Sequence, residues 1–271
     1  ILWLMKHGTI FPPDWRVRAF AYALCLACLL MPVGTEARTG LVCIAILAGL
    51  MLVRAKRRFV YGPLMALAAL VAIPFLPASF TQRMSTIENH QGDESASTRL
   101  AVWKWTLDYV KEHPGGGGFD NYLQNSFTYH TQERVIDSGG SRIERRLVTD
   151  KGRAYHSAYF EMLGEQGYFG FGLWLLIHLI CFIRTESIRR LYRNRDGPGE
   201  AWIAPFALAL QQGHIIYMVG SLFVGIAYQP FIFMMLSLHI GLDTYLTRKR
   251  RDVARPPLVR LQPLRPIRGG M

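Results

Sequence analysis

The sequence has 271 residues, of which 51% are hydrophobic, and it carries a formal net charge of +12 at pH 7. The apolar residues are concentrated in long runs, which argues against an ordinary soluble domain. A nucleic-acid-binding protein gathers positive charge on a folded face, whereas here the charge lies in the connections between apolar runs. Nucleic-acid binding is therefore excluded.

Six apolar runs follow one another along the chain, near residues 17–33, 39–53, 59–77, 169–183, 201–225 and 231–246. A helix needs about 20 residues to cross about 30 Å of hydrocarbon, and the shorter runs reach this length with their polar flanks. Six such runs exceed what the core of a soluble helical protein needs, although such a protein is the alternative. We therefore predict an all-α, polytopic integral membrane bundle of about six spans.

The basic residues are concentrated in three short segments, with four at 54–58, five at 184–195 and eight at 248–268. Short loops rich in Lys and Arg stay on the cytoplasmic side of a membrane. The long stretch 78–157 has ten basic and ten acidic residues and is neutral overall. We expect this stretch to be extracytoplasmic and both ends of the chain to be cytoplasmic.

This layout divides the chain into four parts: three spans in residues 1–77, an extracytoplasmic loop at 78–157, three spans in 158–246 and a basic cytoplasmic tail at 247–271. A loop of this length is a candidate for function. All four cysteines lie in apolar runs, which is typical of small hydrophobic packing residues rather than of disulfides or zinc ligands. Because the sequence begins with Ile1 rather than Met, we expect an N-terminal portion to be missing.

The segment "SASTRLAVWKWTLDYVKEHPGGGG" predicts an amphipathic helix in the long loop. Ser97 or Thr98 would cap its start, and Pro114 with the four glycines would end it. Its apolar stripe would consist of Leu100, Trp103, Leu107 and Val110. Arg99 would lie in the first turn, where the helix dipole disfavours a cation. It is either a surface arginine or part of an anion site beside free backbone N–H groups.

Arg38, in "GTEARTG", and His156, in "RAYHSAYF", lie on the same predicted side as Arg99. Arg38 either pairs with Glu36 at the membrane edge or faces the bundle interior, where charges are more often functional. Guanidinium groups bind phosphate bidentately, and an imidazole can take a proton from a hydroxyl near neutral pH. The three residues together indicate a lipid-linked phosphate or diphosphate that is attacked by an alcohol.

Several common motifs are absent from the sequence, among them DxD, GxxxxGK[ST], GxSxG and HExxH. We therefore expect no metal site and no cofactor. His178 and His239 lie inside apolar runs and are interpreted as hydrogen-bonded packing residues. His214 is a polar residue within a predicted span, for which a functional part stays open.

The segments "STRLAVWKWTLDYVKEHPGGGGFDNY", "AYHSAYFEMLGEQGYFGFGLWL", "ALALQQGHIIYMVGSLFVGIAY" and "GTEARTGLVCIAILAGL" cover most of residues 30–245. With these segments the chain resembles the O-antigen ligase and polymerase superfamily of integral membrane glycosyltransferases. Within it, the chain is most similar to the O-glycosylation ligases associated with exosortase A systems. The arginine motif departs from the usual Ser-Arg-Gly, because this sequence has Ala37-Arg38-Thr39.

The resemblance implies transfer of a glycan from undecaprenyl diphosphate to a hydroxyl acceptor, outside the bacterial inner membrane and without a nucleotide or metal. It implies that His156 is the catalytic base and that Arg38 and Arg99 bind the diphosphate. Trp103 and Glu165 match supporting positions, and Glu165 would orient His156, bind sugar or simply lie at the mouth of a span. A single displacement would invert the anomeric carbon.

Three other functions stay open at this point. A polymerase of O-antigen or exopolysaccharide shares these motifs and differs in its acceptor, which is another lipid-linked glycan. A polysaccharide or lipid transporter would favour broken spans with charges near the middle of the membrane. A non-catalytic membrane scaffold would tolerate the loss of His156. The sequence names neither the sugar nor the acceptor.

Overall fold

The computed structural model describes residues 14–35, 37–72, 94–137, 140–195, 197 and 199–254. The helices of this part are α2 (Trp15–Gly34), α3 (Arg38–Arg54), α4 (Arg58–Ala72), α6 (Glu94–Glu112), α7 (Ala158–Tyr192), α8 (Ile203–Gly220) and α9 (Pro230–Ala254). A 3₁₀ helix, η3 (Asn121–Gln124), leads into an antiparallel hairpin of β1 (Ser126–Asp137) and β2 (Gly140–Lys151). Each apolar run contains one of these helices, so the predicted, mostly helical fold is confirmed.

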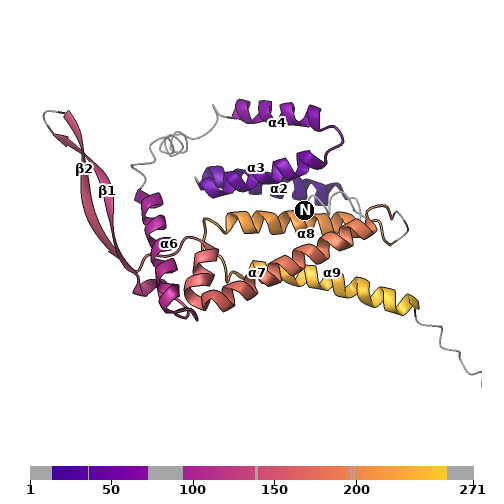
Figure 1. Cartoon of the computed structure of the whole chain (residues 1–271). Helices are drawn as coiled ribbons and strands as arrows, with labels where there is room; N and C mark the ends of the chain where they lie inside the picture. The colour runs from indigo at the N-terminus through magenta and orange to yellow at the C-terminus, as the bar shows by residue number, and fades with distance from the viewer. Residues whose placement is uncertain are drawn as a thin grey trace, which may run out of the picture.

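The helices form a bundle in which α7 packs against both α8 and α9 (Figure 1). On another side, α8 packs against α3, which also contacts α2 and α4. Helix α6 and the hairpin stand at the end of the bundle where α7 begins (Figure 1). The long segment between the two groups of helices is therefore placed directly beside the first residues of α7.

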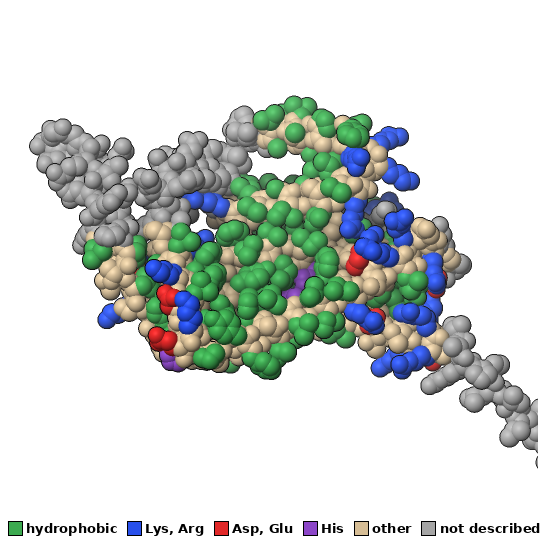
Figure 2. All heavy atoms as spheres, viewed as in Figure 1, with side chains coloured by type: hydrophobic (Ala, Val, Ile, Leu, Met, Phe, Trp, Pro, Cys, Tyr) green, Lys and Arg blue, Asp and Glu red, His purple; other side chains and the backbone are tan. Residues whose placement is uncertain are grey.

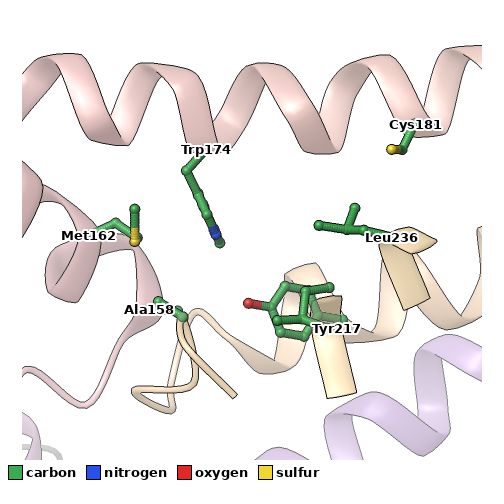
Figure 3. Close-up of a cluster of buried hydrophobic side chains, with 8 residues drawn as sticks. Ala158, Met162, Trp174, Cys181, Tyr217 and Leu236 are labelled. Carbon is green, nitrogen blue, oxygen red and sulfur yellow. The ribbon is translucent and has the colours of Figure 1, made fainter. Parts of the chain in front are cut away.

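Apolar contacts hold α7, α8 and α9 side by side. Figure 3 shows Trp174 and Cys181 of α7 pointing toward Tyr217 of α8 and Leu236 of α9, and these four side chains belong to one buried cluster. A second buried cluster joins the same three helices farther along, through Ile188, Tyr192, Ile203, Ala207, Leu210, Leu242 and Leu246. The two clusters fix the positions of these helices along most of their length.

The outside of the bundle is apolar as well, as the green surface in Figure 2 shows. Phe20, Phe169 and Met234 are 68%, 77% and 68% exposed. Soluble monomers rarely expose continuous apolar patches of this kind. The buried side chains, by contrast, include several polar ones: Thr185, Gln211, His214, Ser221 and His239. An apolar exterior around a partly polar interior is typical of a helical membrane protein.

Two of the described helices, α2 and α7, are long and apolar enough to cross a membrane. Helix α3 has 17 residues, and α4 is apolar over the shorter range Arg58–Val71. Gln211 and His214 lower the hydropathy of α8, and His239 and Asp243 that of α9. The predicted number of about six spans is therefore not confirmed. The basic side chains nonetheless gather at the end of the bundle away from α6, as Figure 2 shows.

The structure corrects two details of the predicted loop helix. Helix α6 begins at Glu94, so Ser97 and Thr98 lie inside it and Arg99 lies in its second turn rather than beside free backbone N–H groups. Its buried face consists of Val102, Thr106 and Val110, whereas Leu100 and Leu107 are exposed. The predicted end of the helix before Pro114 is confirmed. Residues 78–93 of the predicted loop and 255–271 of the predicted tail lie outside the described residues.

The hairpin was not anticipated from the sequence. Its two strands pair over their full length, from Ser126 opposite Lys151 to Asp137 opposite Gly140. Polar residues are frequent in both strands, and no regular apolar alternation indicates a buried face in the sequence. The hairpin brings Lys151, which lies five residues before His156, back to the end of η3.

Candidate active site

His156 lies in a bend immediately before α7, with a backbone φ of +50°. Such a left-handed conformation is uncommon outside glycine, and here the neighbouring residues enforce it. Tyr155 and Ser157 on either side are 2% and 1% exposed, whereas the His156 side chain is exposed. The next residue, Ala158, donates its backbone N–H to the Ser221 carbonyl over 2.8 Å, which ties the start of α7 to the end of α8. The bend therefore presents the imidazole outward from a fixed backbone.

Trp103 of α6 supports the same bend from the other side. Its Nε1–H donates to the Tyr155 carbonyl over 2.8 Å, and its ring stacks on Phe160 at 4.7 Å between centroids. Trp103, which the sequence predicted as a supporting residue, thus fixes the backbone directly before His156. Since Arg99 lies one helical turn before Trp103, the same contact holds Arg99 on the His156 side of the loop.

Asn125 anchors the chain just before this bend. Its Nδ2 donates to the Arg153 carbonyl over 2.7 Å, and its Oδ1 accepts from the Arg153 N–H over 3.0 Å. The Arg153 guanidinium in turn donates to Asp150 Oδ2 over 2.8 Å, and the same oxygen accepts from the Tyr129 hydroxyl over 3.0 Å. The base of the hairpin therefore determines where Arg153, Tyr155 and His156 lie.

Two positive charges act on His156. The pKa of His156 lies below its usual value because the ring is partly desolvated and because the guanidiniums of Arg99 and Arg153 disfavour a further positive charge. The imidazole is therefore neutral near pH 7, the form that accepts a proton. The Nε atom of Arg99 is buried and has no hydrogen-bond partner among the described residues. A buried guanidinium N–H without a partner is costly, and an anion at this position would satisfy it.

Arg38 is the first residue of α3, which lies along α8. Cys43, five residues later, donates its thiol to the Ile216 carbonyl of α8. At the other end of α3, Arg54 interacts electrostatically with Arg189 and Glu186 of α7. These contacts orient α3 so that Arg38 lies toward the end of the bundle where Ser221 and Ala158 meet.

Glu165 is buried and holds in place the glycine loop, residues 114–118, that follows α6. Its Oε1 accepts from the Asp120 N–H over 3.1 Å, and its backbone carbonyl accepts from the Gly118 N–H over 2.9 Å. The loop fits against a kink in α7 at Gly167, where φ is +62°. A Cβ at Gly167 would lie 2.1 Å from the Pro114 carbonyl oxygen, so only glycine allows this approach.

The structure thus brings Arg99, Trp103 and His156 together at one end of the bundle, whereas Glu165 of α7 contacts the glycine loop. Sequence reasoning missed Arg153 and Asn125. Arg153 could have been noticed as a third arginine beside His156, whereas Asn125 is 28 residues from its partner and carries no local signal. Within the part of the chain that the structure describes, no group of three or more His, Cys, Asp and Glu converges to hold a metal ion.

Comparison with known families gives one match. The family model of O-antigen ligases matches residues 23–175, which is more than half of the chain and includes Arg38, Arg99, Trp103, His156 and Glu165. This chain belongs to the O-antigen ligase family. It is therefore an integral membrane protein of polysaccharide biosynthesis, and the family suggests an enzyme that acts on lipid-linked glycans. No curated protein and no solved structure matches the chain.

The family match confirms the predicted superfamily. It also places the apolar exterior of the bundle in a membrane. Helix α8 lies beyond the matched residues, yet it supports the bend at His156, since the Ser221 carbonyl after α8 accepts from the Ala158 N–H.

Proposed function

We propose that this O-antigen ligase family member transfers a glycan from undecaprenyl diphosphate to a hydroxyl acceptor, as an O-glycosylation ligase of the kind associated with exosortase A. The observation that carries the proposal is a neutral, outward-facing His156 on a fixed backbone, with the guanidiniums of Arg99 and Arg153 near it. In a transfer of this kind an imidazole takes a proton, and guanidiniums hold the departing diphosphate.

The mechanism is a single displacement. His156 removes the proton of the acceptor hydroxyl while the oxygen attacks the anomeric carbon, so the configuration inverts. Arg99, whose buried Nε lacks a partner, and Arg38, at the same end of the bundle, bind the diphosphate and stabilise the charge that grows on it. The arginines supply this charge, so transfer needs no metal. Trp103 and Glu165 act indirectly, because the first fixes the backbone before His156 and the second fixes the glycine loop.

The test compares variants in membranes supplied with lipid-linked glycan and a hydroxyl acceptor. His156→Ala and His156→Gln should each lose about 10²–10⁴-fold in transfer rate, because neither side chain accepts the proton. His113→Gln changes an exposed histidine at the end of α6 and should leave the rate unchanged. If both His156 variants insert normally and transfer glycan at the parental rate, His156 is not the base.

The arginines are tested by substitutions that separate charge from geometry. Lysine keeps the positive charge but lacks the planar fork of the guanidinium. Arg38→Lys and Arg99→Lys should therefore slow transfer, and the alanine variants should slow it further. Lys104→Ala, on the exposed face of α6, is the control. Parental rates for both alanine variants would contradict diphosphate binding.

The choice of acceptor separates the ligase from a polymerase. When lipid-linked glycan is the only substrate, a ligase should form no product, whereas a polymerase should lengthen the lipid-linked glycan itself. Elongation without any other acceptor would therefore favour polymerase activity.

The proposed absence of a metal is tested with EDTA. The rate of glycan transfer in the presence of EDTA should equal the rate in its absence.

The orientation follows from the distribution of charge. The basic end of the bundle would face the cytoplasm, and α6 with the hairpin would face the periplasm. Single cysteines at Thr128 and Arg248, in a background with the native cysteines replaced, report the two sides. An impermeant thiol reagent applied to cells with a permeabilised outer membrane should label the first position only. Labelling of the second position only would reverse the orientation.

A further inference from the structure

Three buried histidines form a continuous chain across the bundle, one from each of α7, α8 and α9. His178 Nδ1 lies 2.8 Å from His214 Nε2, and His214 Nδ1 lies 3.3 Å from His239 Nε2. His239 Nδ1 continues the chain to the Thr185 hydroxyl at 2.6 Å. The three imidazoles are 3%, 1% and 2% exposed. Ionisable side chains at such positions in membrane helices commonly mark proton pathways.

The hydrogen-bond pattern of this chain is directional. A neutral imidazole has one N–H donor and one acceptor nitrogen, so the direction of one link fixes the direction of the next. When Thr185 donates to His239, His239 donates to His214, and His214 donates to His178. His178 then carries its proton on Nε2, which is buried and has no partner among the described residues. The three rings therefore behave as one unit rather than as separate packing residues.

The chain can accept one further proton without losing a link. The added proton binds His239 Nδ1, and the Thr185 hydroxyl turns so that its oxygen accepts from the new N–H. His239 can then pass its Nε2 proton to His214, and His214 can pass its own to His178. In each form every link holds one proton. A second added proton would place two N–H groups opposite each other and break a link.

The side chains around His178, at one end of the row of histidines, suit a shared positive charge. The ring of His178 lies 4.6 Å from that of Trp174 and 5.5 Å from that of Tyr217. Aromatic rings at these distances stabilise a desolvated cation. The rings lie in a row and do not converge on a point, which disfavours a metal site.

The helices packed around the three histidines carry other titratable and charged groups. Glu186 follows Thr185 on α7, accepts from Gln211 of α8 and pairs with Arg189 and Arg190. Asp243 of α9 pairs with Arg184. The remaining titratable or charged groups on the packed helices are Cys181 and Glu161 on α7, Tyr217 on α8, and Cys43 and Arg54 on α3.

We propose that His178, His214 and His239, with the Thr185 hydroxyl as the hydrogen-bond partner at one end, form a membrane-buried site that binds a single proton and shares it over three rings. The site is separate from the proposed transfer reaction, since its histidines lie along the helices and His156 lies before α7. Its occupancy changes the hydrogen bonds that join α7, α8 and α9.

The test uses the full-length protein with ¹⁵N-labelled histidine rings in lipid nanodiscs. Couplings across N–H···N bonds should link His178 to His214 and His214 to His239. Between about pH 8 and about pH 4, the signals of the three rings should change in one common step that corresponds to one bound proton. His113→Gln should leave this step unchanged, because His113 is exposed and directly follows α6.

Two further variants test the chain itself. His214→Gln keeps a polar side chain but interrupts the passage between rings, so His178 and His239 should lose their common step. Thr185→Val removes the hydroxyl that accepts from protonated His239 and should move the step to lower pH, whereas Thr185→Ser should retain it. The wild-type couplings and the Thr185 pair still decide the question if His214→Gln does not fold.

Three results would overturn the proposal. These are separate steps for the three rings, the absence of any step over the pH range in which the protein stays folded, or a step that takes up more than one proton. A shift of the same signals on addition of Zn²⁺ would instead assign the cluster as a metal site. Glycan transfer is measured in parallel, so that failure of the proton site is distinguishable from failure of His156.

Discussion

Asn125 is the residue whose replacement most directly tests how the backbone positions His156. Its side chain is 1% exposed and makes a hydrogen-bond pair with the backbone of Arg153, three residues before His156. Asn125→Asp keeps the shape of the side chain. It replaces the Nδ2 donor by a carboxylate oxygen, which then faces the Arg153 carbonyl at the 2.7 Å position. The hydrogen bond from the Arg153 N–H is therefore kept, whereas the contact with the Arg153 carbonyl becomes repulsive.

The size of the effect follows from the lost hydrogen bond. A net hydrogen bond contributes about 1 kcal/mol, and a buried carbonyl left without a partner costs about 1–3 kcal/mol. A local cost of about 2 kcal/mol lowers the population of correctly placed His156 roughly 30-fold. Asn125→Ala loses both interactions and should be at least as damaging.

The assay measures initial rates of glycan transfer in membranes, normalised to the amount of inserted protein. We expect kcat of Asn125→Asp to fall about 30-fold, while KM for the lipid-linked donor changes little because the arginines are retained. Gln124→Glu adds the same charge at the exposed neighbouring position and should transfer at the parental rate. A parental rate for Asn125→Asp would refute the conclusion that the Arg153 backbone positions His156.

Three further changes test the surrounding structure. Arg153→Gln removes a charge that lowers the His156 pKa, so the pKa of His156 should rise. The acidic limb of the pH–rate profile, where the base becomes protonated, should then move to higher pH. An unmoved limb would contradict this. Gly167→Ala should lower the melting temperature by costing at least about 1–2 kcal/mol, whereas Gly172→Ala, with open space around its Cβ, should not. Trp103→Phe keeps the stacking on Phe160 but loses the indole donor, and a fall of about 5-fold in transfer rate is expected; an unchanged rate would argue against this support.

The sequence alone determined the helical class and the approximate place of each helix, and it selected the candidate site residues. Apolar runs specify helices because their composition is local, and Pro114 with the glycines ends α6 wherever the helix packs. His156, Arg38 and Arg99 could be selected because an imidazole and guanidiniums on one predicted side suit phosphate chemistry. The family match covers these residues, although their individual roles stay predictions.

Only the tertiary structure decided which side chains meet. The buried face of α6 was predicted from apolar residues, yet the structure buries Thr106 and exposes Leu107, because α6 packs against the bend before α7 as well as against the hairpin. Glu165 was expected to orient His156, bind sugar or lie at the mouth of a span, and the structure shows in addition that its carboxylate holds the glycine loop. Asn125 and Arg153, and the three histidines of separate helices, are partners across 28, 36 and 25 residues. Contacts at such separations depend on how helices pack, which residue patterns within one segment do not encode.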